Sequence, residues 1–96
     1  MNELQEDISL KLDEPKMFKV LLLNDDVTTM DFVVQVLMDI FHYDIEKASR
    51  IMLEIHHLGK GLCGVYTQEI ALSKQRQVIN AAMKANFPLR VELEEE

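Results

Sequence analysis

Cysteine is almost absent from the 96-residue chain, because Cys63 is the only one. A single thiol cannot form an internal disulfide, so no disulfide framework ties this protein to an oxidising compartment. Glycine and proline are also scarce, with three and two residues, while hydrophobic residues make up 48% of the chain. This composition is typical of a folded helical or mixed domain and not of a disordered chain. We therefore expect a folded cytoplasmic protein.

Long apolar runs are missing as well. No stretch approaches the roughly 20 apolar residues that cross a bilayer. The first 16 residues carry acids where a signal sequence has a basic and apolar pattern. We therefore expect neither a membrane partner nor export. A chain of 96 residues has enough apolar surface for one core and too little for two.

Clusters of positive charge are absent, and the formal net charge is −7. The excess of acids lies at the two ends, in residues 1–16 and 92–96, whereas eight acids and eight bases balance in residues 17–91. A neutral core without a basic patch gives no electrostatic footprint for DNA or RNA, so we expect no nucleic-acid partner. We interpret residues 1–16 as a flexible N-terminal extension and residues 17–96 as the core domain.

Hydrophobic periodicity and turn residues predict six elements in the order strand, helix, helix, strand, helix, strand. They are expected over residues 18–23, 30–41, 45–58, 62–66, 68–85 and 89–93. The small-residue face of the last helix is expected to contain Ile70, Val78, Ala81, Ala82 and Ala85. This order favours an α+β fold in which three helices cover one side of an open three-stranded antiparallel sheet.

The segment between the first strand and the first helix combines polar and apolar side chains. In one interpretation Asn24 and Asp25 form a turn, Thr28 or Thr29 caps the helix and Met30 fills the core. In the other interpretation, the amide and carboxylate oxygens are several hydrogen-bond acceptors with no positively charged donor beside them. They would then form a site for a cation such as an ammonium group. The residues alone leave both interpretations open.

The remaining candidates for chemistry are weak. His56 and His57 point about 100° apart on a helix, so they do not form a metal site. A histidine at this place is typically half-buried and bonded to the backbone. Cys63 lies in a predicted strand, and no serine occurs in a motif that would activate it. We expect no metal, no cofactor and no catalytic residue.

Three segments together resemble a known family. They are FKVLLLNDDVTTMDFVVQVL, ASRIMLEIHHLGKGLCGVYTQEIA and FPLRVEL, and they resemble ClpS, the bacterial adaptor of the N-end rule pathway, over residues 17–93. The runs NDD, Thr-x-Met, MLxxHxxGK and CGVYT occur in the family's order and spacing. The resemblance implies a three-stranded antiparallel sheet with three helices, similar also to the C-terminal domain of a ribosomal stalk protein.

The resemblance also implies a function. A ClpS protein binds the free α-amino group and the large first side chain (Phe, Leu, Trp or Tyr) of N-degron substrates. It acts as a monomer and delivers them to the N-terminal domain of the AAA+ unfoldase ClpA for degradation by ClpAP, using the mobile extension. By this resemblance the amino-group site and its rim comprise Asn24, Asp25, Asp26, Thr28 and His56. The hydrophobic pocket comprises Met30, Val33, Met52, Ile55 and Leu89, with Met30 as a gate against β-branched residues, and the ClpA-binding residues are Glu69 and Lys74.

Two positions depart from the family pattern, since Thr29 stands where the family often has proline and Ile55 where it often has valine. The rank order among the four first residues therefore stays open. Two other functions compete with the adaptor. The acidic pair and His56 could form a small hydrolase or metal site, or the core could be a docking module without an N-degron pocket.

Overall fold

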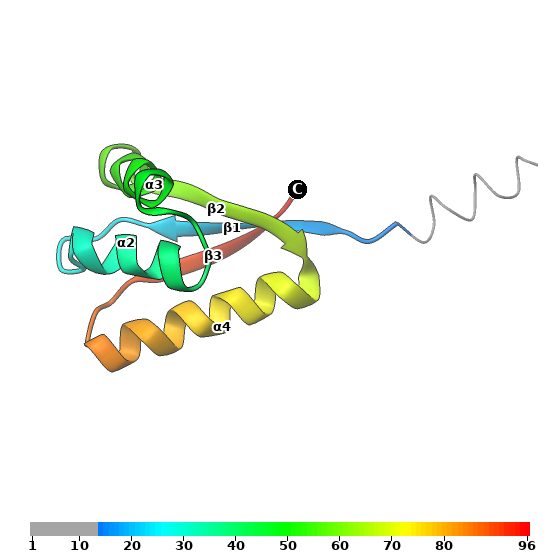
Figure 1. The fold of residues 1–96 in the computed structure, drawn as a ribbon. Helices are drawn as coiled ribbons and strands as arrows, with labels where there is room; N and C mark the ends of the chain where they lie inside the picture. The colour runs from blue at the N-terminus through cyan, green and yellow to red at the C-terminus, as the bar shows by residue number, and fades with distance from the viewer. Residues whose placement is uncertain (1–13) are drawn as a thin grey trace, which may run out of the picture.

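The computed structural model describes residues 14–96. The predicted extension of residues 1–16 therefore lies almost wholly outside the described residues. The fold is α+β with the predicted order of elements (Figure 1). The elements are β1 (Met17–Leu23), α2 (Met30–Asp39), α3 (Ile45–Leu58), β2 (Lys60–Thr67), α4 (Gln68–Ala85) and β3 (Arg90–Glu95). The predicted fold class is confirmed.

The three strands form one antiparallel sheet in the order β2-β1-β3. The most apolar strand, β1, lies in the middle, and its Val20 and Leu22 are fully buried. The β1–β2 register shifts between Val20 and Leu21, which leaves Cys63 of β2 without a partner in β1. The hydroxyl of Tyr43 donates to the carbonyl of Cys63 at 2.6 Å, so this irregularity leaves no orphaned carbonyl.

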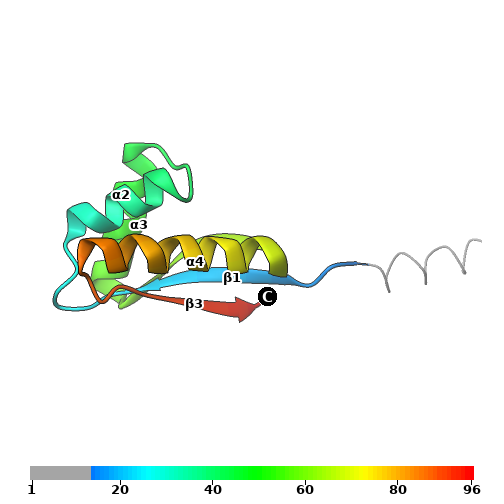
Figure 2. The same cartoon turned by 90° about the horizontal axis from the view of Figure 1, so that it is seen from below.

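The helices cover one face of the sheet. Helix α4 runs along that face and contacts all three strands (Figure 2). Helices α2 and α3 pack against each other, and α3 also packs against β2. The core fills the space between these layers and includes Val20, Leu22, Val36, Leu37, Ala48, Ile55, Cys63 and Val78. No helix within residues 14–96 has the length and apolarity to span a membrane.

The helix ends follow local chemistry. Thr29 is the N-cap of α2, and its side chain accepts from the Phe32 amide at 3.2 Å. Asp44 caps α3 by accepting from the Lys47 amide at 2.8 Å. Gly59 ends α3 with a φ of 91°, a left-handed conformation that glycine adopts without a steric penalty. These caps explain why both helices begin at the predicted residues.

The buried face of α4 differs from the predicted one. Ala71, Val78 and Ala82 are buried, whereas Ile70 is 48% exposed and Ala85 is also exposed. The prediction was therefore wrong for Ile70 and Ala85. The buried residues are spaced by seven and four, which is one helical face, and Ile70 lies about 100° from that face.

Candidate functional site

The backbone holds the end of β1 against the end of α3. The amide of Asn24, the first residue after β1, donates to the carbonyl of Gly59 at 2.8 Å. Gly59 is the C-cap of α3, whose last turn carries His56. One main-chain hydrogen bond therefore places Asn24 beside the turn that presents His56.

Asp25 closes the loop that follows. Its Oδ1 accepts from the amides of Val27 at 2.8 Å and Thr28 at 2.6 Å, and its Oδ2 accepts from the Thr28 hydroxyl at 2.7 Å. Partial burial opposes ionisation, but the bonds donated by Thr28 and Val27 outweigh it and hold the pKa of Asp25 below its ordinary value. Asp25 is therefore a carboxylate at neutral pH, with its acceptors occupied by the loop.

Asp26 has a different environment. It is exposed, and within residues 14–96 its carboxylate accepts no hydrogen bond. Both of its oxygens remain available to a ligand. The two adjacent acids therefore differ: Asp25 holds the shape of the loop, whereas Asp26 has free hydrogen-bond acceptors.

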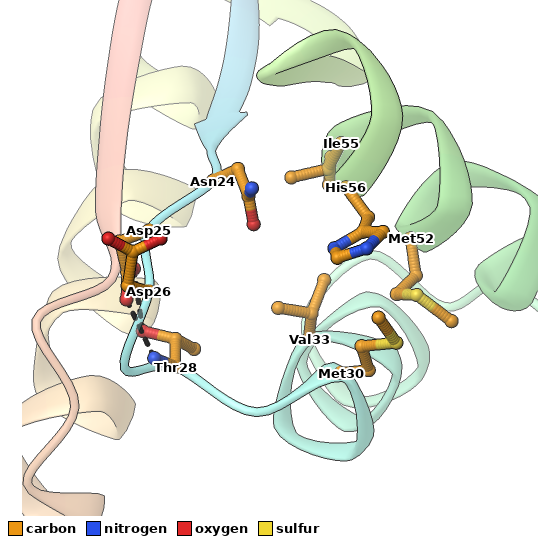
Figure 3. Close-up of a pocket in the computed structure, with 9 residues that line it drawn as sticks. All are labelled: Asn24, Asp25, Asp26, Thr28, Met30, Val33, Met52, Ile55 and His56. Atoms are coloured by element: carbon orange, nitrogen blue, oxygen red, sulfur yellow. Dashed lines mark hydrogen bonds between the residues drawn. The ribbon is translucent and has the colours of Figure 1, made fainter.

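A cavity of about 230 Å³ lies between this loop and the two helices α2 and α3 (Figure 3). The loop supplies its polar side, and the side chains of Asn24 and His56 both point into the space between them. Nine predicted site residues line it: Asn24, Asp25, Asp26, Thr28, Met30, Val33, Met52, Ile55 and His56. The volume is small beside drug-sized pockets of roughly 300–1,000 Å³, so the cavity suits one side chain and its backbone end.

The apolar side consists of a rim and a wall. Met30 begins α2 and is 43% exposed, and Met52 of α3 is half-buried. Val33 and Ile55 are buried, and Ile55 belongs to the hydrophobic core. Met30 therefore does not fill the core, as one interpretation of the sequence had it. Methionine at a rim suits a variable ligand because its unbranched side chain adapts its shape.

The His56 side chain is exposed and makes no hydrogen bond to any other described residue. The interpretation of a half-buried histidine bonded to the backbone was therefore wrong. The ring lies edge-on to His57, with 5.2 Å between the two ring centroids. Its nitrogen atoms stay free for a ligand in the cavity.

Three predicted site residues lie elsewhere. Leu89 is buried, with 6% of its surface exposed, in the core cluster and does not line the cavity. Glu69 is exposed in the first turn of α4. Lys74 is half-buried, and its Nζ donates to the carbonyl of Ile40 at 2.6 Å, so it contacts the C-terminus of α2 directly.

The charge of the cavity selects its ligands. Two aspartates line it, together with an amide, a hydroxyl and an imidazole, and none of the described lining residues is a lysine or arginine. Within residues 14–96 no three His, Cys, Asp or Glu side chains gather as metal ligands. Acceptors of this kind favour a cationic hydrogen-bond donor, and the apolar wall favours a hydrophobic group attached beside it.

Known proteins share both sequence and fold with this chain. A family model described as ATP-dependent Clp protease adaptor protein ClpS matches residues 13–92. An ATP-dependent Clp protease adapter protein ClpS from Campylobacter jejuni strain 81-176 is 71% identical over 86 residues, covering 90% of each chain. One from Syntrophus aciditrophicus is 52% identical over 85 residues, covering 88% of this chain and 79% of the relative.

A solved structure agrees with these relatives. It is Agrobacterium tumefaciens ClpS2 bound to L-phenylalaninamide, and it superposes with a TM-score of 0.84 at 35% sequence identity. The match covers 86% of this chain and all of that one.

Proposed function

Because the chain belongs to the ClpS family of ATP-dependent Clp protease adaptor proteins, we propose that its cavity binds the first residue of N-degron substrates. The chain is an adaptor of a Clp protease and not an enzyme. In the proposed complex the polar side holds the free α-amino group, and the apolar side takes the first side chain. The adaptor then delivers the substrate to a ClpA-type AAA+ unfoldase for degradation by ClpAP.

One observation carries this proposal. The side chains of Asn24 and His56 carry free acceptors and point into the same cavity as an apolar wall (Figure 3), and Asp26 also lines this cavity. An α-amino group offers three donors and a positive charge, and one side chain lies on the next carbon atom. The start of a protein chain therefore matches both sides of the cavity at once, whereas an internal peptide segment has no ammonium group to offer.

The ligand in the Agrobacterium tumefaciens ClpS2 structure supports the same chemistry. L-phenylalaninamide has a free α-amino group, a benzyl side chain and an amide in place of the rest of a chain. We propose that in this chain such an amine lies against the acceptors of the loop and His56, and that the ring lies against the wall formed by Val33 and Ile55.

Both sides of the cavity are needed for useful affinity. Burial of one large apolar side chain contributes roughly 1.5–3 kcal/mol. Each charge-assisted hydrogen bond contributes about 1.5–3 kcal/mol. A micromolar complex requires about 8.2 kcal/mol after the costs of association, so neither side suffices alone. We therefore propose that the adaptor reads the amine and the side chain together, and prefers Phe, Leu, Trp and Tyr.

Met30 supports the exclusion of β-branched first residues. It lines the cavity and is 43% exposed, so it lies at the rim. We propose that the Cβ of a bound first residue lies against this rim. A second branch at Cβ is rigid and broad, so it would meet this rim before the rest of the side chain reached the wall. Val and Ile as first residues are therefore expected to bind more weakly than Leu.

Docking on the unfoldase is proposed for another surface. Glu69 and Lys74 lie in the first turns of α4, outside the cavity. An adaptor must hold substrate and protease at the same time, so separate surfaces suit the role. We propose that this end of α4 contacts the N-terminal domain of ClpA, and that residues 1–16 act in delivery.

Fluorescence anisotropy with labelled peptides tests the proposed function. A peptide that begins with Phe and has a free amine should bind with a Kd near micromolar. Its N-acetylated form should bind at least about a hundredfold more weakly, because acetylation removes the charge and leaves desolvated acceptors unpaired. A peptide with the same composition but Phe at position two is the control. Equal affinity for the free and acetylated peptides would refute the proposal.

A further inference from the structure

Gly61 of β2 lies in contact with Ile55 of α3. A Cβ atom at position 61 would lie 2.6 Å from Cγ1 of Ile55, 3.5 Å from its Cδ1 and 3.6 Å from the carbonyl oxygen of Ile51. The first distance is closer than side chains approach one another, so an added methyl group forces Ile55 to move. Gly61 is paired with Leu22 of β1, and its φ is not positive. Space, and not backbone conformation, therefore requires glycine here.

Ile55 transmits this contact to the cavity. It is only 2% exposed and belongs to the core, but it also lines the cavity. Protein interiors are close-packed, so a displaced core side chain moves towards open volume. For Ile55 that volume is the cavity, since the rest of its surroundings is packed core.

We infer that Gly61 sets the depth of the cavity by letting Ile55 sit back against β2, and so determines access for aromatic first residues. This inference rests on the proposed function. Gly61 does not touch the ligand and acts as a positioning residue. The side chains of Phe, Tyr and Trp extend further from Cβ than that of Leu, so they need the depth that Gly61 provides.

Three variants of the full chain test the inference: Gly61→Ala, Ile55→Val and the double variant. The measurement is the Kd for two peptides with free amines, one beginning with Phe and one with Leu. Gly61→Ala should weaken Phe binding about tenfold, the effect of about one methylene in an apolar pocket, and weaken Leu binding less than about threefold. Valine is one methylene shorter than isoleucine, so when displaced it occupies less of the cavity. The double variant should therefore regain most of the Phe affinity.

Gly64→Ala is the matched control. Gly64 lies in the same strand, and a Cβ there would collide with Tyr66, which does not line the cavity. This variant should lose stability without changing the ratio of the Phe and Leu dissociation constants. Thermal unfolding of each variant separates a loss of fold from a change of preference.

The outcomes are distinct. An unchanged Phe-to-Leu ratio in folded Gly61→Ala, or a double variant no better than Gly61→Ala, would overturn the inference. If Gly61→Ala does not fold, the Kd values of Ile55→Val for the two peptides test the inference. The shorter side chain deepens the cavity, so this variant should favour Phe over Leu more than the unaltered protein does, and an unchanged preference would overturn the inference. Failure of the unaltered protein to distinguish free from acetylated Phe peptides would instead refute the proposed function.

Discussion

Asp25 uses both carboxylate oxygens to hold the loop between β1 and α2. Three hydrogen bonds from Val27 and Thr28 end on this one side chain. Its role is therefore to fix the loop that contributes Asn24 and Asp26 to the lining of the cavity. The family resemblance placed both Asp25 and Asp26 in the amino-group site. The structure distinguishes them, because Asp25 holds the loop whereas the carboxylate of Asp26 has no hydrogen bond among the described residues.

Asp25→Ala should lower the free energy of unfolding by about 1–2 kcal/mol at neutral pH, because it leaves two amides and a hydroxyl without their acceptor. The folded-state pKa of Asp25 lies below its ordinary value. The ionised Asp25 therefore contributes its full stabilisation above about pH 4, which is the pKa of the carboxyl group in the unfolded chain. This stabilisation is lost as the pH falls through the lower pKa of the folded state. Urea unfolding across this range should show the two proteins converging in acid.

The matched control is Asp26→Ala, because Asp26 is the neighbouring carboxylate without these bonds. That variant should keep the stability of the unaltered protein and lose peptide affinity. A stability gap for Asp25→Ala that stays constant into acid would contradict the role of its ionised form.

Cys63 should be unreactive in the folded protein. It is fully buried, and burial raises the pKa of its thiol to about 12. Alkylation requires the thiolate and access to solvent, so iodoacetamide at about pH 8 should modify the native protein at least about a hundredfold more slowly than the urea-unfolded chain. Mass spectrometry over time measures both rates. Similar rates in the two states would show that the thiol is accessible.

At the scale of helices and strands, most boundaries could be predicted from the sequence because they depend on neighbouring residues. Asp44 and Gly59 mark the two ends of α3 by side-chain and backbone chemistry that is local. The longer β2 could not be predicted, because its outer residues are strand only through pairing with β1. The prediction for α4 was wrong at Ile70, which is exposed. A large apolar residue is expected in the core, and the sequence alone does not show that this one faces solvent.

Lys74 links helices α4 and α2. Its Nζ donates to the Ile40 carbonyl at the C-terminus of α2 and lies 5.9 Å from the ring centroids of both Phe41 and Tyr66. A cation is favourable at a helix C-terminus, and the carbonyl has no partner within its own helix. Lys74 therefore holds α4 against the end of α2.

Lys74→Ala should lower the free energy of unfolding by about 1–2 kcal/mol, since it removes a charge-assisted hydrogen bond and two cation–π contacts. Chemical denaturation measures the effect. Lys84→Ala is the control, because Lys84 is exposed in the last turn of the same helix. Equal stability of the two variants would show that the Lys74 contacts contribute nothing to the fold. Binding of ClpA by Lys74→Ala should then be compared at conditions where the variant is folded.

At the scale of the whole molecule, the site arises from segments far apart in the chain. Composition and periodicity identified the loop after β1 as polar, but they gave no reason to place His56 opposite Asn24. That placement depends on the pairing of β1 with β2 and on the hydrogen bond from Asn24 to Gly59, which no side-chain pattern records. The family resemblance supplied what periodicity could not, and nine of its ten predicted cavity residues do line the cavity.

The predicted division into an extension of residues 1–16 and a core domain can be tested by deletion. Removal of residues 1–16 should leave the thermal midpoint and the affinity for a Phe peptide unchanged, because no residue before Asn24 lines the cavity among those described. The same deletion should slow the degradation of a Phe-starting substrate by ClpAP, if these residues act in delivery. Calorimetry, anisotropy and a degradation assay measure the three quantities. A large loss of stability would place part of the extension in the folded domain.

The most direct measurement for the central claim is an amide chemical-shift titration of the full chain with L-phenylalaninamide and with its N-acetylated form. The free amine should shift signals from the loop of residues 24–30 and from Met52, Ile55 and His56, which surround the cavity. The acetylated compound should leave these signals in place at the same concentration. Shifts that map outside the cavity, or equal shifts for both compounds, would contradict recognition of a chain's first residue at this site.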